Sequence, residues 1–532
     1  MATIIKAAPW KKSLAAIAVA GLLGSSLTAS AQTLHRGIGG EPGTLDPNHV
    51  SGNWEDMVVG DLFMGLVTEG SDGNNIPGAA ESWSVSEDGK TYTFKLRKDS
   101  KWSDGQPVTA ADFVYGLRRI LDPATAAKYA YLLYPIENAE ALNKATMKGM
   151  DNLGVKAVDD FTLEMTLKAP TPYFIDQLNH YTSFPLPKHV VEKHGTAWVK
   201  PGNMVSNGAY KLVEWLPQTH IKAVKNEHFY DAGNVAIDTV QYYPTEDRPA
   251  ALKRFRAGEL DLNYEFPIDQ FKWLKENMAD QAIVAPQLGT YYYPINNRDE
   301  KFKDVRVRKA LSMAINREII TEKVLKTGEV PAYSFVPPGV GNYQIQEADF
   351  KAQSYKDRLK EARSLMEAAG YSKDKPLTFQ LRYNTHDAHK KVAVAVASMW
   401  KQIHVKAELF NSEVAVHYAD LKEGDFEVAR AGWLGDYPDA QNFLSLLEAT
   451  PNNYGGYRND QFQQLMDKAA VTLDKQERLN LMQQAERIAM DEYATIPIYY
   501  YVSTNLVAKH VKGWQPNVVD IHRTRWMSLA DK

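Results

Sequence analysis

The 532-residue sequence contains no cysteine. This absence excludes a thiolate nucleophile, a disulfide framework, a cysteine-ligated metal centre and a lipid anchor on an N-terminal cysteine. The sequence also lacks an excess of positive charge, because 61 Lys and Arg face 65 Asp and Glu and give a formal net charge of −4. This balance disfavours nucleic acid as a partner. With 44% hydrophobic residues, a chain of this length is expected to form two to four domains with their own cores.

Familiar catalytic and nucleotide-binding motifs are missing as well. There is no Gly-x-Ser-x-Gly elbow, no Walker A loop and no His-Glu-x-x-His pair. The glycine-rich residues 37–43 precede Pro47, which favours a turn-rich connector over a nucleotide loop. His386 and His389 are the only close histidine pair and have no neighbouring Glu, so no metal centre and no cofactor are predicted. Nothing selects two carboxylates as a catalytic acid and base, so an enzyme has no positive support.

The first 31 residues have the layout of a secretory signal. Three lysines precede an apolar run at 14–23, and the small residues Ala29, Ser30 and Ala31 follow it. Cleavage is predicted after Ala31, so that the mature chain starts at Gln32, and an uncleaved N-terminal anchor is the alternative. No later apolar run reaches about 18 residues, which predicts a soluble mature protein without a lipid anchor in a bacterial periplasm.

The mature chain alternates strand-like and helix-like segments and shows no internal repeat, which indicates an α/β or α+β fold. Thr109 is a predicted helix N-cap, and Asp304 is another. Strands are predicted at 92–97, 377–383, 405–409 and 496–502, and helices at 110–121, 356–369, 392–403 and 476–491. The run 377–409 has the order strand, helix, strand, which is typical of a βαβ unit.

The most informative segment is 426–439, a predicted strand that is broken by Gly432, Gly435 and Pro438. Within it, Asp436 lies between aromatic residues, where a carboxylate loses hydration unless it meets a cation. A ligand could bring that cation. An internal salt bridge, or an N-cap for the helix expected at 440–448, explains the residue equally well. Arg430 could bind a ligand carboxylate through a bidentate pair, or pair with a surface acid.

Several longer motifs, taken together, carry a family resemblance. They are "EPGTLDP" (41–47), "AAESWSVSEDGKTYTFKLRKDSKWSDGQPVTAADFVY" (79–115), "NMVSNGAYKL" (203–212), "TYYYPINN" with "DVRVRKALSMAINREIITEKV" (290–324) and "ARAGWLGDYPD" (429–439). In this order they resemble the periplasmic oligopeptide-binding proteins of ABC importers, a family that also contains dipeptide, murein-peptide and nickel binders. The resemblance covers essentially the whole mature chain.

The resemblance implies an α/β fold of the periplasmic-binding-protein type (type II, cluster C), with three domains and two lobes that close on a hinge. Domain I would consist of 32–63, 188–288 and 505–532, domain II of 64–187, and domain III of 289–504. The chain crossings near 288 and 504 would form the hinge. Closure favoured by a bridging ligand would then signal occupancy to the membrane permease.

The resemblance also implies roles for individual residues. Asp436 would receive the α-ammonium of a peptide. The main chain of Gly432, Trp433, Leu434, Gly289 and Tyr292 would pair with the peptide like an added strand. Arg430, His389 and Lys323 would bind the carboxylates of peptides of different lengths. Tyr129 and Tyr264 would line the pocket, and Tyr292 is also expected there.

The sequence therefore predicts a non-catalytic, monomeric receptor that delivers short peptides to an inner-membrane ABC permease. A murein peptide, a nickel chelate or haem is the alternative ligand, and a secreted hydrolase is the alternative class. Departures from the family pattern at Ser51, Gln287 and Leu421 leave ligand length and side-chain preference open.

Overall fold

The protein is described by a computed structural model that covers residues 32–450 and 452–530, so the predicted signal segment 1–31 lies outside the described residues. The largest sheet has the strand order β17-β12-β18-β11-β1-β10-β9-β8, and β13 pairs with β18 off this path. Its strands are β1 Thr33–Gly37, β8 Tyr210–Leu216, β9 His220–Lys225, β10 Thr239–Tyr243, β11 Leu262–Tyr264, β12 Ala282–Pro294, β13 Val330–Pro331, β17 Ala431–Leu434 and β18 Thr495–Val507. Strand β1 pairs parallel with both β10 and β11, whereas the other pairs are antiparallel.

Four smaller sheets accompany it. A four-stranded sheet has the order β4-β5-β7-β6, a three-stranded sheet has the order β15-β14-β16, and two further sheets contain a single strand pair each. Their strands are β2 Val67–Glu69, β3 Asn75–Pro77, β4 Ala80–Val85, β5 Thr91–Leu96, β6 Val155–Asp159, β7 Thr162–Thr166, β14 Leu377–Asn384, β15 Val405–Ser412, β16 Val428–Ala429, β19 Val511–Lys512 and β20 Ser528–Leu529.

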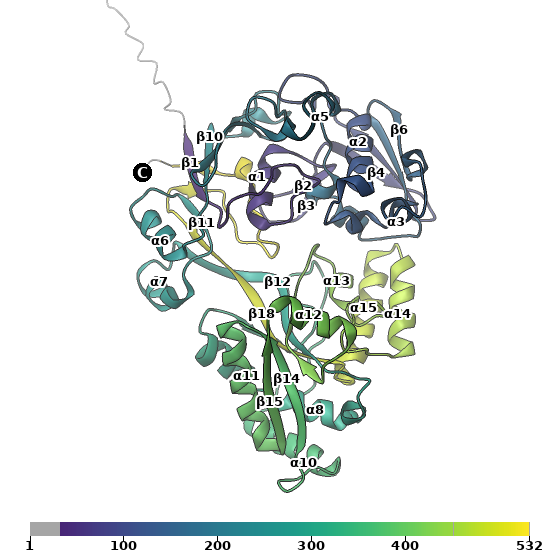
Figure 1. Ribbon diagram of the computed structural model, residues 1–532, viewed down its shortest axis with the longest axis vertical. Helices are drawn as coiled ribbons and strands as arrows, with labels where there is room; N and C mark the ends of the chain where they lie inside the picture. The colour runs from purple at the N-terminus through teal and green to yellow at the C-terminus, as the bar shows by residue number, and fades with distance from the viewer. Residues whose placement is uncertain (1–31, 451, 531–532) are drawn as a thin grey trace, which may run out of the picture. The chain divides into compact units, whose positions relative to one another are not determined.

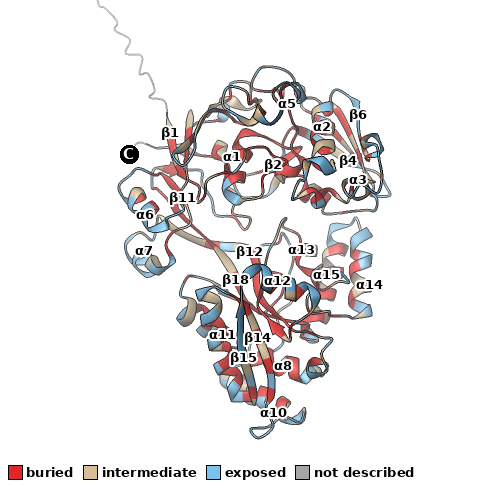
Figure 2. Cartoon of the chain, viewed as in Figure 1, coloured by how far each residue is buried: buried red, intermediate tan, exposed pale blue. Residues whose placement is uncertain are grey.

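The longer helices α10, α14 and α15 present exposed residues on one side and buried residues on the other (Figure 2). The helices are α1 Asn53–Leu62, α2 Ala110–Leu121, α3 Ala139–Asn143, α4 Phe174–Gln177, α5 Lys188–His194, α6 Arg248–Arg256, α7 Phe271–Asn277, α8 Val305–Met313, α9 Arg317–Ile319, α10 Tyr355–Ala368, α11 Asp387–Trp400, α12 Val414–Glu423, α13 Gln441–Leu444, α14 Asp460–Val471 and α15 Lys475–Asp491.

Local sequence signals account for the helix ends. Thr109 and Asp112 form a capping box at the start of α2, and the Asp304 carboxylate accepts a hydrogen bond from the Arg306 backbone at the start of α8. Shortly after α10, Gly370 has φ +91°, a conformation that favours glycine. These features confirm the predicted helices at 110–121 and 356–369 and the cap at Asp304.

The predicted βαβ unit is confirmed. Strands β14 and β15 pair in parallel along their whole length, from Leu377 with Val405 to Asn384 with Ser412, and α11 connects them. Strand β16 adds to the other side of β14, also in parallel. The three strands therefore form a small parallel sheet beside the larger one.

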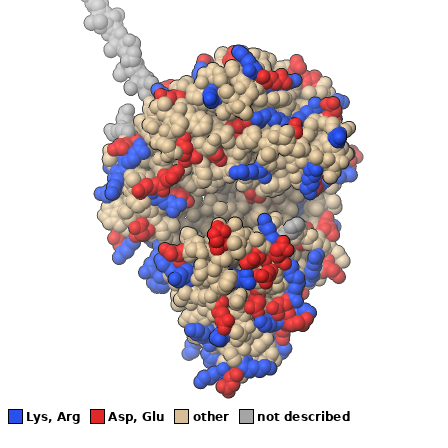
Figure 3. All heavy atoms as spheres, viewed as in Figure 1, with Lys and Arg blue, Asp and Glu red and all other residues tan. Residues whose placement is uncertain are grey.

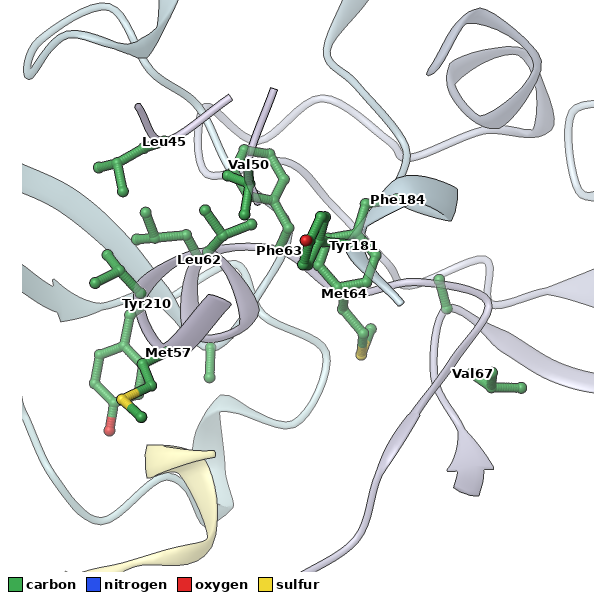
Figure 4. Close-up of a cluster of buried hydrophobic side chains, with 14 of the residues drawn as sticks. Leu45, Val50, Met57, Leu62, Phe63, Met64, Val67, Tyr181, Phe184 and Tyr210 are labelled. Carbon is green, nitrogen blue, oxygen red and sulfur yellow. The ribbon is translucent and has the colours of Figure 1, made fainter. Parts of the chain in front are cut away.

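Buried hydrophobic residues form two clusters. The first contains residues between 34 and 274 and between 506 and 527, and the second contains residues between 288 and 499. Figure 4 shows part of the first cluster around α1, where Met57, Leu62 and Phe63 are buried. Each cluster is large enough to stabilise its own half of the chain.

Two long strands connect these halves. Figure 1 shows β12 and β18 side by side along most of their length. Along β12 the packing changes from the first cluster to the second between Val284 and Leu288, and along β18 it changes between Tyr501 and Leu506. The pairing register shifts at the same level, between Pro286 and Thr290. These crossings lie where 288 and 504 were expected to form a hinge, and the division into three domains stays a prediction.

Candidate functional site

Strand β17 is at one end of the nine-stranded sheet. Its only partner among the described residues is β12, which pairs Gly289 with Leu434 and Tyr291 with Gly432. The opposite edge of β17 is therefore open to pairing with another extended chain. The prediction that Gly432 breaks the strand was wrong, because β17 continues to Leu434. The interruption comes at Arg430, between β16 and β17, because these two strands belong to different sheets.

The expectation for Tyr292 was also wrong. Tyr292 lies in β12 and pairs with Ala431 on one side and with Pro497 on the other, so its main chain is already committed. Its side chain is 3% exposed and packs edge-on against Phe335, with ring centroids 5.0 Å apart. Gly289 lies in the same strand, where a Cβ atom would come within 2.5 Å of the Leu434 side chain. Gly289 therefore allows close packing and does not line the cavity described next.

A cavity of about 300 Å³ lies beside the end of β17. The space-filling view shows the surface hollowed in this part of the molecule (Figure 3). Residues of α1, of segment 179–181, of β12, of segment 434–438 and of the C-terminal segment 518–523 line it. Of the predicted site residues, the lining includes Asp436, Leu434, Tyr129 and Tyr264, and it does not include Arg430, Gly432, Trp433, His389, Lys323, Tyr292 or Gly289.

Asp436 brings a carboxylate to this cavity. Burial raises the pKa of its carboxyl to about 6, and a hydrogen bond with Asn442 offsets part of the rise. Within the described residues, no Lys, Arg or His forms an ion pair with Asp436, whereas Asp439 binds Arg478 through two hydrogen bonds of 2.6 and 2.8 Å. Asp439 also accepts a hydrogen bond from the Gln441 backbone. The internal salt bridge and the helix-start contact considered for Asp436 are thus made by Asp439.

Asn442, which the sequence did not single out, fixes the loop around Asp436. Its Oδ1 accepts hydrogen bonds from Trp433 Nε1 at 2.7 Å and from the Asp436 backbone at 3.3 Å. The residue is 3% exposed. One side-chain amide therefore ties the indole of Trp433 in β17 to Asp436, two residues after the strand. No local sequence pattern marks an asparagine for this role.

Tyrosine rings also line the cavity. Tyr129 stacks on Tyr131 with centroids 5.7 Å apart and contacts His180 and Tyr181. Burial, and then the negative charge of Asp436, raise the pKa of the Tyr129 hydroxyl. On the side of α1, Tyr264 Oη accepts a hydrogen bond of 3.2 Å from Asn53. The cavity thus combines aromatic faces with hydroxyl groups.

Arg430 is the main cation at the other end of β17. It is 8% exposed, donates hydrogen bonds to Asn384, Tyr418 and Tyr501, and lies 5.0 Å from the ring centre of Tyr291. No carboxylate forms a salt bridge with it in the part of the chain that the structure describes, and its Nε has no hydrogen-bond partner there. A buried guanidinium without a counter-ion is suited to bind an anion.

The structure brings His389 to this cation but leaves Lys323 apart. His389 lies 5.6 Å from Tyr291 between ring centres, and burial together with the charge of Arg430 lowers its pKa to about 3. The imidazole is therefore neutral at neutral pH. Lys323 is exposed on a helical turn at 320–325, and it forms no salt bridge with a described residue. Among the described residues there is no group of three or more potential metal ligands.

A buried ion-pair network forms part of the cavity wall and was missed by sequence reasoning. Arg523 binds Glu69 through two hydrogen bonds of 3.1 Å and Asp56 through bonds of 3.3 Å. Gly60 makes room for it, since a Cβ atom there would lie 1.6 Å from Arg523 Nη1. The lining contains four carboxylates and two arginines: Asp56, Glu69, Asp436, Asp520, Arg36 and Arg523. The wall is therefore net acidic.

Comparison with known proteins identifies the family. Residues 74–455 match the model described as bacterial extracellular solute-binding proteins, family 5 Middle. The chain belongs to this family. It is 41% identical to the periplasmic oligopeptide-binding protein OppA of Salmonella typhimurium over 95% of this chain and 96% of the relative. This membership confirms the predictions of a solute-binding protein and of a protein that is not an enzyme.

Solved structures of the family confirm the predicted fold class. The structure titled MppA periplasmic murein tripeptide binding protein, unliganded open form, matches with a TM-score of 0.88 at 38% identity, covering 94% of this chain and 98% of that one. Haemophilus influenzae OppA in complex with RPPGFSPFR matches with a TM-score of 0.72 at the same identity, covering 94% and 99%. The TM-score is therefore higher with this MppA structure than with this OppA complex. None of the helices in 32–450 and 452–530 is both long enough and apolar enough for a membrane span.

Proposed function

We propose that this solute-binding protein captures short peptides in the periplasm and delivers them to an ABC permease in the inner membrane. The observation that carries the proposal is Asp436: a carboxylate in a cavity, with a pKa of about 6 and no ion pair with any described Lys, Arg or His, near the end of an open strand edge. A peptide α-ammonium supplies the missing charge. The neighbouring strand edge supplies main-chain hydrogen bonds.

Both ends of β17 fit the two termini of one peptide. Asp436 follows the strand and Arg430 precedes it, so opposite charges flank four residues of strand. At roughly 3.4 Å per residue, this strand spans about 14 Å, which suits an extended peptide of about three to four residues. Recognition through the main chain and termini leaves side-chain identity open. Gly432, Trp433 and Leu434 contribute the edge, whereas Tyr129 and Tyr264 contact the first residues of the ligand.

The smaller basic residues have secondary roles in this proposal. Neutral His389 donates or accepts a hydrogen bond beside Arg430, because its low pKa leaves it uncharged. Lys323 contributes only long-range attraction, since its side chain is exposed and held by no salt bridge.

A murein peptide is the second candidate ligand. The specific observation in its favour is the TM-score of 0.88 with a murein tripeptide binding protein. Both candidates need an ammonium that can reach Asp436 and an anionic group that can reach Arg430.

Delivery requires that the two halves move. We propose that β12 and β18 are the hinge, because the packing changes from one cluster to the other along both strands and their pairing register shifts at the same level. Domain I (32–63, 188–288 and 505–532) and domain II (64–187) then form one lobe, and domain III (289–504) forms the other. The proposed export signal is 1–31, and the proposed working form is a monomer that docks on its permease.

Native mass spectrometry of the purified protein tests the function. We expect a bound mass that fragments into peptide ions, and calorimetric binding of trialanine with intact ligand recovered afterwards. Trialanine with an acetylated amino group is the matched control, because it removes only the charge that Asp436 would bind. Equal affinity for both, a bound haem or metal mass, or hydrolysis of the peptide would contradict the proposal.

A further inference from the structure

A second contact joins the two halves of the protein through residues outside β12 and β18. Tyr173 precedes α4, whose Phe174 belongs to the first hydrophobic cluster, and Tyr437 follows Asp436 in the loop after β17. The two rings are parallel within 1°, with centroids 5.3 Å apart. Neither tyrosine lines the cavity. The stack thus connects segments more than 260 residues apart without belonging to the ligand site.

Arg478 supports this stack from the second half. Its guanidinium makes the two hydrogen bonds with Asp439, and its central carbon lies 5.6 Å from the centre of the Tyr173 ring. The side chains of Arg478 and Asp439 are 7% and 12% exposed. A cation held in place by a carboxylate therefore packs on the aromatic face that comes from the other half.

An apolar contact lies nearby. Leu473, in the turn between α14 and α15, approaches Gly89 so closely that a Cβ atom on this glycine would be 2.8 Å from Leu473 Cδ2. The same Cβ would be 3.2 Å from the Pro170 side chain. Gly89 has φ +70°, so a side chain there would be strained as well as crowded. The contact between the halves therefore extends from Tyr437 to the tip of the α14 and α15 hairpin.

Charged groups complete the interface. Asp176, on α4, accepts a hydrogen bond of 2.7 Å from Asn75. Burial, and then the charge of Asp439 from the other half, raise the pKa of Asp176 to about 6, while Lys475 and Arg478 act in the opposite direction. A carboxylate of the first half thus lies within electrostatic reach of a carboxylate and two cations of the second half.

We propose that the stack of Tyr173 on Tyr437 is a clasp that limits the opening of the two halves and positions the loop of Asp436. Tyr437 is the residue next to the carboxylate, so a ring that holds Tyr437 also restricts Asp436. Tyr173 is therefore a positioning residue for ligand binding, although it belongs to the other half of the protein and does not line the cavity. The role in binding rests on the proposed peptide function, whereas the role in opening does not.

Three variants and one control test the clasp. Tyr173→Phe keeps the ring, Tyr173→Leu keeps apolar volume without a ring, and Tyr173→Ala removes both. Tyr134→Ala is the matched control, a half-buried tyrosine that bonds Asn143 within the same half. Trialanine affinity is measured by calorimetry, and the radius of gyration of the ligand-free protein is measured by small-angle X-ray scattering.

We expect Tyr173→Ala and Tyr173→Leu to weaken trialanine binding about three- to tenfold, the range of a lost aromatic pair, mainly through faster dissociation. Both should enlarge the ligand-free radius of gyration, while Tyr173→Phe and Tyr134→Ala leave both quantities unchanged. An unchanged radius and affinity in Tyr173→Leu would overturn the clasp, as would an equal change in Tyr173→Phe. If the parent protein binds no peptide, the proposed function fails and the scattering data alone decide the clasp.

Discussion

The two ends of β17 carry opposite charges in contrasting surroundings. Asp436 faces the cavity and is fixed by Asn442, whereas Arg430 is enclosed by Tyr291, Tyr418 and Tyr501. Neither forms an ion pair with a described residue. We expect the carboxylate to lose its proton when a cationic ligand binds, while the guanidinium keeps its charge and already makes three hydrogen bonds. Binding should therefore depend on pH at the Asp436 end and on the fixed position of the side chain at the Arg430 end.

The largest expected effect comes from neutralising Asp436. Asp436→Asn should weaken the binding of free-amine peptides by about 2–5 kcal/mol, because the ligand ammonium would then be desolvated without a counter-charge. Calorimetry with trialanine measures this change. Unchanged affinity would remove Asp436 from the site.

Asp439→Asn changes the neighbouring carboxylate, which is already paired with Arg478, and its main effect should be on stability. We expect it to lower the free energy of unfolding by about 3–5 kcal/mol, which is the scale for breaking a buried ion pair. Denaturant unfolding measures this loss. A variant of normal stability would show that the pair contributes little.

The opposite end should be less sensitive. Arg430→Gln should weaken the binding of peptides with a free C-terminal carboxylate by about 1.5–3 kcal/mol, the scale of a hydrogen bond to a charged group. The binding of the same peptides with an amidated C terminus should weaken much less. Equal losses for acid and amide, measured by calorimetry, would mean that Arg430 acts on the protein rather than on the ligand carboxylate.

The pH dependence should come from the Asp436 end. Because the unliganded carboxyl has a pKa of about 6 and an ammonium favours its charged form, a proton must leave on binding below that pH. Affinity should fall by up to about tenfold per unit below pH 6, which is about 1.4 kcal/mol. It should stay level up to about pH 8, where the peptide α-amino group loses its proton.

Calorimetry in buffers of different ionisation enthalpy counts the released protons. Asp436→Asn should abolish the loss of affinity below pH 6, whereas Arg430→Gln should preserve it. A loss of affinity that persists in Asp436→Asn would assign the titration to another group, such as Asp176.

The smallest effect on peptide affinity is expected from Asn442, whose side chain holds the loop of Asp436. Asn442→Ala leaves the charge of Asp436 intact but removes the acceptor of Trp433 Nε1, so peptide affinity should fall by about 1 kcal/mol. Tryptophan fluorescence should shift at the same time. A loss as large as that of Asp436→Asn would mean that the loop collapses without this amide.

Local chemistry made much of the fold predictable. Thr109 and Asp304 cap helices through contacts with residues two or three positions away. The alternation of apolar and polar residues in the βαβ unit reveals its strands directly in the sequence. Only the family resemblance favoured Asp436 as a ligand-binding candidate, because no local pattern could separate it from a structural carboxylate. Its neighbour Asp439 has the same residue type and a structural role.

The remaining features depend on contacts between distant segments. The residues next to Tyr292 in the sequence do not show that its strand lies inside the sheet. The two strands that pair with it come from the distant segments 431–434 and 495–507. Arg523 meets Glu69 across 454 residues of sequence. Sheet order and ion pairs of this kind follow from the tertiary fold, which a reading of neighbouring residues does not contain.

The open edge of β17 has a mechanical consequence. In the sheet order, β17 is followed by β12 and then by β18, the two strands that pass between the halves. A peptide that joined this edge would become the outermost strand of the sheet, at about 10 Å from β12 when strands are roughly 4.8 Å apart. With β12 and β18 as the proposed hinge, a ligand this close to the axis would move little on closure, while distant surfaces of the two halves would move much further. A permease that senses those surfaces would register occupancy as a large displacement, produced by a ligand that scarcely shifts.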